Sequence, residues 1–384
     1  MMVVVTAFGR RGCLVAATLL LVAAAPAAGQ VANGRLQLHF MNVGQGDGAL
    51  LVSPKGETVL FDDGVRNNCA LPESYLEGLG VTSVDYHVAS HYHDDHIGCA
   101  KAVLGRFPVN KAAFDRGGDF KTATFKAYVA IVGNKRTTIT PGQTLTLDAN
   151  SPNPVLIQFV AANATVPDGG TVTEAGNEND LSVVAVITYA GFRAEMGGDL
   201  SGQDEGDYAD VESLVAPSVG LLDLYKVHHH GSAFSSNSAW LNTTRPTVGI
   251  VSAGEGNKHH HPTPEAIDAL HAVGTMLFWT TTGNGAPVAK GTDTVGGNIV
   301  VEVDAAKKSF AVTTGITSPL PTVQTFALKA ASGVAPNTPK FAWSKKASVY
   351  HLASCRFVGN IAAANLERGA QAPQKKRLHE QCSQ

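Results

Sequence analysis

Short apolar segments, separated by turn-forming glycine, asparagine and aspartate, recur along most of the chain. Residues 36–40 alternate apolar and polar side chains, and residues 49–52 are continuously apolar. A Gly-Asp-Gly sequence lies between these two segments and is typical of a tight turn, so the pattern predicts a β-hairpin. Further strands are predicted at residues 58–61 and 84–89.

Later segments mix strand and helix patterns. The sequence predicts helices at residues 100–107, 208–214 and 264–273, and strands at residues 155–157, 182–187, 192–196, 248–251 and 298–303. Hairpins with interspersed helices favour an α/β fold in which sheet layers are covered by helices.

The C-terminal part of the chain differs in composition. Residues 317–340 combine prolines with serine, threonine and alanine and show no sustained period, which is typical of a linker. We therefore expect a large domain over residues 36–316 and a small module over residues 341–384. A module of this size needs a disulfide or a metal staple, because it is too small for an independent core.

The N-terminus has the pattern of a cleavable export signal. Arg10 and Arg11 precede the apolar residues 14–24, and small residues follow. We expect residues 1–29 to be removed and the protein to be secreted or periplasmic. A retained anchor is the alternative. The apolar run is short for a spanning helix of ~20 residues, and no later segment is long enough, so we expect no stable membrane insertion.

Composition and charge exclude few functions. The chain has 384 residues, of which 44% are hydrophobic and 16% charged, and its formal net charge is −3. These values are typical of a globular protein. They supply no global basic field, which argues against tight nonspecific binding of nucleic acid but is compatible with a local basic groove.

A dense cluster of polar side chains directly follows the predicted strand at residues 84–89. It reads Ser90-His91-Tyr92-His93-Asp94-Asp95-His96, with the spacing H-x-H-x-D-H. Imidazole and carboxylate groups are the donors that a borderline cation such as Zn²⁺ selects. Donors where a strand ends and a helix begins face a cleft, so the pattern predicts a metal site. A histidine-rich surface loop is the alternative.

Further donors follow other predicted strands. Asp62 comes after the strand at residues 58–61, Asp199 after the strand at residues 192–196, and a run of three histidines begins at His228. An aspartate after a strand is often only a turn cap. The occurrence of all these donors in one order along the chain supports a shared site.

This ordered set resembles the metallo-β-lactamase superfamily. Residues 42–47 (Asn-Val-Gly-Gln-Gly-Asp), residues 226–232 (Lys-Val-His-His-His-Gly-Ser) and His261-Pro262 look like the hydrolase domain of ComEC-type competence proteins and their secreted relatives, including teichoic-acid phosphorylcholine esterases. The resemblance covers residues 36–312. It implies a four-layered αββα sandwich with two metal ions at the sheet edge, followed here by the small Cys/His module.

The resemblance also implies a division of ligands between two zinc ions per chain. His91 and His93 would bind one ion. Asp95 and His96 would bind the other, and Asp199 would bridge both. The expected reaction is hydrolysis by a hydroxide held between the metals. Manganese is an alternative, because carboxylate-rich sites suit Mn²⁺.

Other residues receive supporting roles by resemblance. Either His229 or His230 would complete the second metal site. Asp62 would orient ligands by hydrogen bonding. His261 would stabilise oxyanion charge or protonate a leaving group. Asn179 would contact substrate or, alternatively, cap the start of a strand.

The chain departs from the family pattern in several places. Asn42, His228 and Cys99 stand where relatives commonly have Asp, Pro and Gly. The changes at Asn42 and Cys99 affect loops but remove no donor. Between His96 and His228 there is no histidine at all. Lactamases and lactonases of the superfamily normally use a histidine there, so its absence favours the ComEC-type subgroup.

Four cysteines would reach an oxidising compartment after export, and they allow three pairings. Cys69 follows the first acidic motif and Cys99 directly follows the histidine cluster, so we expect these two to pair. The other cysteines lie in the C-terminal module, where a small zinc site and a disulfide are equal alternatives. The residues concerned are His351, Cys355, His379 and Cys382.

The sequence therefore predicts a phosphodiesterase of this superfamily. Its substrate would be a phosphoester, either in nucleic acid or in a cell-wall polymer or choline phosphoester. A lactonase or β-lactamase, and a polymer-binding module with a vestigial site, are the alternatives. No oligomeric state is predicted.

Overall fold

The computed structural model describes residues 32–316, residues 320–329 and four short strands between residues 341 and 378. The predicted export signal at residues 1–29 lies outside the described residues, as do Cys355, His379 and Cys382. His351 lies in a described strand, but only its backbone is described.

A nine-stranded sheet contains both ends of the large domain. In spatial order its strands are β17 (Thr322–Ala327), β16 (Ser309–Thr314), β15 (Ile299–Asp304), β1 (Leu36–Phe40), β2 (Gly48–Val52), β3 (Thr58–Asp63), β4 (Val84–Val88), β5 (Val109–Asp115) and β6 (Arg136–Thr138). Pairing is antiparallel from β17 to β3 and parallel from β3 to β6. The predicted hairpin is confirmed.

An eight-stranded sheet faces the first one. In spatial order its strands are β14 (Asp293–Val295), β13 (Met276–Trp279), β12 (Val248–Val251), β11 (Leu224–Lys226), β10 (Phe192–Met196), β9 (Val184–Tyr189), β8 (Val155–Ala161) and β7 (Thr144–Leu147). Strands β7 to β10 pair in antiparallel fashion and β10 to β14 in parallel fashion.

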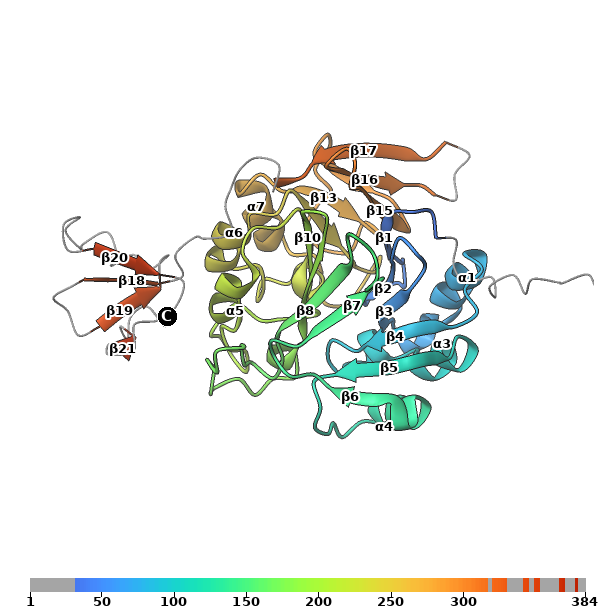
Figure 1. Cartoon of the computed structure of the whole chain (residues 1–384), viewed down its shortest axis with the longest axis horizontal. Helices are drawn as coiled ribbons and strands as arrows, with labels where there is room; N and C mark the ends of the chain where they lie inside the picture. The colour runs from blue at the N-terminus through green and yellow to red at the C-terminus, as the bar shows by residue number, and fades with distance from the viewer. Residues whose placement is uncertain are drawn as a thin grey trace, which may run out of the picture.

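Helices cover the outer faces of both sheets (Figure 1). The helices beside the first sheet are α1 (Ala70–Gly78), α2 (Asp94–Ile97), α3 (Ala100–Arg106) and α4 (Ala123–Val132). Those beside the second are α5 (Glu212–Val219), α6 (Ser238–Thr244) and α7 (Pro264–Ala272). Short 3₁₀ helices are η1 (Arg66–Asn68), η2 (Gly133–Lys135), η3 (Asn179–Leu181) and η4 (His228–Gly231).

Three apolar clusters separate the layers. Alternation along β2 sends Leu51 into the cluster between the two sheets and Leu50 into the cluster under the first helical layer. A third cluster, which contains Trp240 of α6, packs the second sheet against its helices. The predicted four-layered αββα sandwich is therefore confirmed.

Two segments differ from the sequence interpretation. The helix predicted at residues 208–214 is wrong in position, because α5 starts at Glu212, where the carboxylate of Asp210 accepts a hydrogen bond from the Ser213 amide. Part of the predicted linker at residues 317–340 is also wrong, because β17 pairs with β16 along its full length. This edge strand was missed because its half-exposed, threonine-rich sequence has little apolar alternation.

The C-terminal strands form a separate four-stranded sheet in the order β20 (Leu366–Gly369), β18 (Phe341–Ser344), β19 (Val349–Leu352) and β21 (Arg377–Leu378). Among the described residues, no helix has the length and apolar composition needed to cross a membrane.

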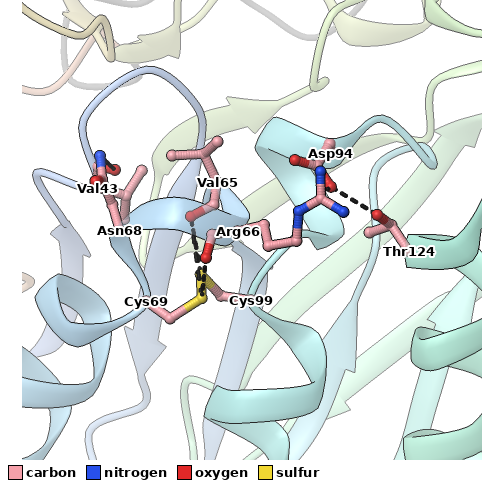
Figure 2. Close-up of a disulfide and its surroundings, with 8 residues drawn as sticks. All are labelled: Val43, Val65, Arg66, Asn68, Cys69, Asp94, Cys99 and Thr124. Carbon is pink, nitrogen blue, oxygen red and sulfur yellow. Dashed lines mark hydrogen bonds and ion pairs between the residues drawn. A yellow bond between two sulfur atoms is a disulfide. The ribbon is translucent and has the colours of Figure 1, made fainter.

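The predicted disulfide between Cys69 and Cys99 is confirmed (Figure 2). Cys69 lies between η1 and α1, and Cys99 lies between α2 and α3. Beside the bond, Arg66 pairs with Asp94, and Thr124 donates a hydrogen bond to the same carboxylate at 2.6 Å. The disulfide and these contacts connect the segment that carries the histidine cluster to η1 and α4.

Replacing both cysteines of this bond with alanine should lower the free energy of unfolding by about 3–4 kcal/mol, because the bond closes a loop with a sequence separation of 30 residues. Urea unfolding of the double variant and of the wild type under non-reducing conditions measures the difference. Reduced wild type is the control and should shift by a similar amount. An unchanged unfolding midpoint would contradict this expectation.

Candidate metal centre

The candidate donors lie where strands of both sheets end. Asp62 is the next-to-last residue of β3 and has a positive φ of 51°. The cluster that contains His91 follows β4. From the second sheet, Asp199 follows β10 and η4 follows β11. Both sheets contribute donors, so the site exists only where the two sheets pack.

Four of the predicted donors converge most closely. Asp95, His96, Asp199 and His230 each offer an atom within 4.8 Å of the others. Nε2 of His230 lies 3.4 Å from both the Asp95 and the Asp199 carboxylates. Nε2 of His96 lies 3.2 Å from Oδ1 of Asp199. We call this set the four-donor cluster.

The four-donor cluster fits a metal ion. Among the described residues, Nε2 of His96, Nε2 of His230 and Oδ1 of Asp199 are buried and have no hydrogen-bond partner. Leaving buried polar atoms without partners is costly, and native structures avoid it. Because two imidazole nitrogens and two carboxylates suit a borderline divalent cation, such an ion would satisfy all of these atoms together.

Hydrogen bonds hold the far sides of two donor rings. Nδ1 of His96 lies 2.8 Å from Asp62, whose carboxylate accepts hydrogen bonds from the backbone and the hydroxyl of Ser90, both at 2.7 Å. Nδ1 of His230 donates to the carbonyl of Ser252 at 2.8 Å. Such partners fix the ring orientation and direct Nε2 toward a metal.

His91 and His93 lie next to this cluster but outside it. Nε2 of His91 is 3.0 Å from Nδ1 of His93, and the His91 ring centroid is 4.1 Å from that of His96. His91 is fully buried and His93 is half-buried. A second ion placed here would have two imidazole donors, as many as an ion in the four-donor cluster, and would need to share the Asp199 carboxylate.

The adjacent residues His229 and His230 take different places. Only His230 belongs to the four-donor cluster. Nε2 of His229 instead lies 3.2 Å from the side-chain nitrogen of Asn179 and 3.8 Å from Asp199. Asn179 therefore lies at the edge of the site, in contact with His229 rather than with the four-donor cluster.

The charges of the site support cation binding. Burial opposes ionisation of Asp199, but the neighbouring His230 and His96 outweigh it, so its pKa lies well below the usual range. Burial likewise lowers the pKa of His230, but Asp199 and Asp47 outweigh it and raise that pKa well above its usual value. The carboxylates are therefore ionised and attract positive charge, which the proton on His230 supplies until a metal ion displaces it.

Asp47 and Lys226 form a buried ion pair that the sequence analysis missed. Oδ1 of Asp47 lies 3.4 Å from Nδ1 of His230. Gly46 before it has no room for a side chain, because a Cβ would come within 2.2 Å of the Asp95 carbonyl oxygen. Asp47 and Lys226 both belong to the motifs that carry the family resemblance, and this membership was the sequence signal that could have identified them.

His228 anchors the turn that carries the other two histidines. Its ring is fully buried, with Nδ1 2.7 Å from Glu212 of α5 and Nε2 3.1 Å from Glu195 of β10. Burial lowers its pKa, but the two glutamates outweigh this and raise the pKa to about 9. A Cβ on Gly197 would lie 2.4 Å from this ring, so glycine lets the network pack against the segment before Asp199.

A cavity of about 340 Å³ opens beside the four-donor cluster. Its lining includes the predicted His261 and Asn179, and also Gln45, Tyr208 and His259, to which the sequence analysis gave no role. Burial lowers the pKa of His261 to about 3, so its imidazole is neutral at pH 7. Its ring centroid is 5.2 Å from that of His229.

Comparison with known families agrees with this geometry. The model of the metallo-β-lactamase superfamily matches residues 42–255. The chain belongs to this superfamily. It is therefore a metal-dependent hydrolase of the metallo-β-lactamase fold, and the residues of the four-donor cluster are able to hold a metal.

Relatives of this chain include competence proteins. ComE operon protein 3 of Bacillus subtilis is 24% identical over 258 residues, covering 61% of the chain and 30% of the relative. Recombination protein 2 of Haemophilus influenzae is 26% identical over 254 residues, covering 63% of the chain and 27% of the relative. Competence protein ComA of Neisseria gonorrhoeae is 31% identical over 106 residues, covering 27% and 14%. The expected ComEC-type resemblance is confirmed, although the chain spans less than a third of each relative.

Solved structures of the same fold are more distant. The metallo-β-lactamase fold protein YhfI of Bacillus subtilis is 14% identical with a TM-score of 0.41, covering 70% of this chain and 100% of that one. A putative metal-dependent hydrolase of Parabacteroides distasonis is 15% identical with a TM-score of 0.39, covering 64% of this chain and 93% of that one.

Replacing His228 with alanine should lower the free energy of unfolding by about 3–5 kcal/mol, because Glu195 and Glu212 would remain buried without their shared partner. Urea unfolding in the presence of a chelator measures this effect apart from metal binding. His271, which pairs with Asp293 from a partly exposed position, is the matched control and should lose far less when replaced with alanine. Equal losses for the two variants would contradict the anchoring role.

Proposed function

We propose that this member of the metallo-β-lactamase superfamily is a secreted phosphodiesterase that acts on nucleic acid. The observation that carries the proposal is the lining of the cavity beside the four-donor cluster. Apart from the aspartates, the lining consists of imidazole, amide and phenol groups, and no lysine or arginine belongs to it. A phosphodiester carries a single negative charge, whereas a monoester carries up to two and needs more cationic groups to offset them. The cavity therefore suits a diester.

Two further observations support the proposal. The stretch between His96 and His228 lacks the histidine that lactamases and lactonases of the superfamily normally use. The names of two relatives refer to recombination and competence, which favours nucleic acid over a cell-wall or choline phosphoester.

Two zinc ions are the proposed cofactors, with Mn²⁺ as the alternative. His230, Asp95 and His96 would hold one ion, and His91 and His93 the other; Asp199 would serve both. Bound ions would polarise the phosphoryl group and make water a nucleophile at neutral pH.

The protein residues around the metals would guide the proton and the substrate. Asp62 keeps the His96 ring in place through its 2.8 Å contact with Nδ1. His261, neutral and part of the cavity lining, would stabilise charge that develops on the leaving oxygen through its ring N–H. Asn179 would position the substrate from the wall that also contains His229.

Export of the chain is also a proposal. The disulfide between Cys69 and Cys99 supports it, because such bonds persist in oxidising compartments and are rare in the cytosol. Residues 1–29 would serve as the signal. The C-terminal residues His351, Cys355, His379 and Cys382 remain a proposed zinc site or disulfide.

Turnover of bis(p-nitrophenyl) phosphate should be measurable with metal-loaded protein, should stop with a chelator and should return with Zn²⁺ or Mn²⁺. Replacing Asp199 with alanine should remove both metal and activity, because this carboxylate would serve two ions. A chromogenic lactam and p-nitrophenyl phosphate are the comparison substrates and should be turned over more slowly. Chelator-insensitive activity, or efficient lactam cleavage without diester turnover, would contradict the proposal.

Replacing His261 with alanine should leave the metal content near that of wild type and reduce diester turnover by about 10²–10⁴-fold, the range for loss of a general acid or a charge-stabilising group. Metal analysis and steady-state kinetics on the same preparations test both parts. His259, whose ring stacks 5.6 Å from that of His261 but is exposed, provides the matched alanine control and should have a much smaller effect. A parallel loss of metal in the His261 variant would argue for a ligand role instead.

A further inference from the structure

The backbone of η4 directs two consecutive histidine rings to different partners. His229 and His230 both have left-handed φ values, 50° and 55°. Their ring centroids are 6.3 Å apart and the ring planes differ by 69°. His230 enters the four-donor cluster, and its Nδ1 is fixed by a backbone carbonyl. This arrangement is typical of a metal ligand.

The surroundings of His229 are different. Its Nε2 lies against the carboxamide of Asn179 rather than in the four-donor cluster. Asn179 is 3% exposed and His229 is 9% exposed, and both belong to the cavity lining. Within the part of the chain that the structure describes, Oδ1 of Asn179 and Nδ1 of His229 have no hydrogen-bond partner. Two nearly buried polar side chains at a cavity thus keep unused hydrogen-bonding capacity.

Neighbouring rings hold His229 in this place. Tyr208 lies 5.8 Å from it, ring centroid to ring centroid, and stacks on Phe234 at 4.5 Å with an interplanar angle of 20°. On another side the His261 ring lies 5.2 Å away, nearly perpendicular. Both Tyr208 and His261 line the same cavity. The His229 ring is therefore fixed at the cavity wall and faces the space in which a substrate would lie.

We propose that His229 and Asn179 together form a binding pair for the phosphoryl oxygens of the substrate, and that His230 alone of the two adjacent histidines binds metal. In the mutual contact at 3.2 Å the Asn179 amide N–H donates to Nε2 of His229, so the proton of the neutral ring is on Nδ1, which has no partner among the described residues. With substrate bound, the Asn179 amide would donate to a phosphoryl oxygen in place of Nε2, and the imidazole would donate through its ring N–H. A neutral imidazole and a carboxamide add donors without adding charge, which suits the single charge of a diester. This inference rests on the proposed phosphodiesterase function and assigns it two substrate contacts.

The competing assignment makes His229 a ligand of the ion beside His91 and His93, where an imidazole is lacking. The matched variants His229→Gln and His230→Gln separate the two assignments. Titration of chelator-stripped protein with Zn²⁺, followed by calorimetry, should give wild-type stoichiometry and affinity for His229→Gln, and the loss of one site for His230→Gln. Cobalt-substituted His229→Gln should keep the visible absorption of wild type. Loss of a metal site or a changed spectrum in His229→Gln would overturn the proposal.

Kinetics test the substrate contact itself. His229→Gln and Asn179→Ala should each reduce kcat/KM for bis(p-nitrophenyl) phosphate by about 10- to 100-fold, the range for a hydrogen bond to a charged group. The double variant should lose little more than either single variant, because the two residues act as one pair. Wild-type kinetics in both single variants, or losses that multiply in the double variant, would overturn the proposal.

A failure of the proposed function can be told apart from a failure of this inference. If wild type does not turn over the diester, the phosphodiesterase proposal fails. Calorimetric titration of zinc-loaded protein with inorganic phosphate then tests the pair directly. Phosphate affinity about 10-fold weaker in His229→Gln and Asn179→Ala supports it, and affinity equal to wild type overturns it.

Discussion

Buried charge at the edge where the two sheets meet is the constraint on which the rest of this structure depends. An ionised group taken out of water is strongly destabilising unless it is paired. The carboxylates of Asp47, Asp62 and Asp199 are all nearly buried at this edge. Lys226 pairs with the first and His96 with the second, and Asp199 keeps one oxygen without a hydrogen bond. Among the described residues, several of the buried polar atoms without a hydrogen-bond partner thus lie around this one point.

Support for the donors comes from outside the site, so the donors are positioned before any ion arrives. Ser90 holds Asp62, and the Ser252 carbonyl holds His230. The His228 network connects β10, which leads to Asp199, with η4 and α5. Because these contacts order the ligands in advance, metal binding need not spend free energy on arranging them. Gly46 permits this by letting the Asp95 carbonyl approach its backbone, and Gly197 by letting the His228 and Glu195 side chains do so.

The sequence predicted those parts of the fold and site that depend on local signals. The H-x-H-x-D-H cluster, Asp62 and Asp199 could be placed because each directly follows an apolar strand. The pairing of Asp47 with Lys226 joins segments far apart along the chain, and that of His228 with Glu212 joins η4 to a helix on the other side of β11. Periodicity carries no information on such contacts. The sequence analysis placed Tyr208 on a helix, whereas α5 starts only at Glu212. Apolar spacing alone cannot show that the Asp210 carboxylate accepts a hydrogen bond from the first turn of α5 and so marks its start. The edge strand β17 was not predicted, because its largely exposed residues show little alternation of apolar and polar side chains.

The separation of His229 from His230 shows why a donor list from sequence cannot assign ligands. Adjacent residues on an extended strand point to opposite faces, and in a helix they diverge by about a quarter turn. Two successive left-handed residues do neither, and here they place the first ring against an amide and the next among carboxylates. Left-handed conformations are unfavourable for residues with a Cβ, so surrounding contacts must enforce them. The buried His228 at the start of the turn, held by two glutamates, enforces these conformations. His228 would touch neither metal nor substrate, yet it fixes the geometry of the two histidines that would.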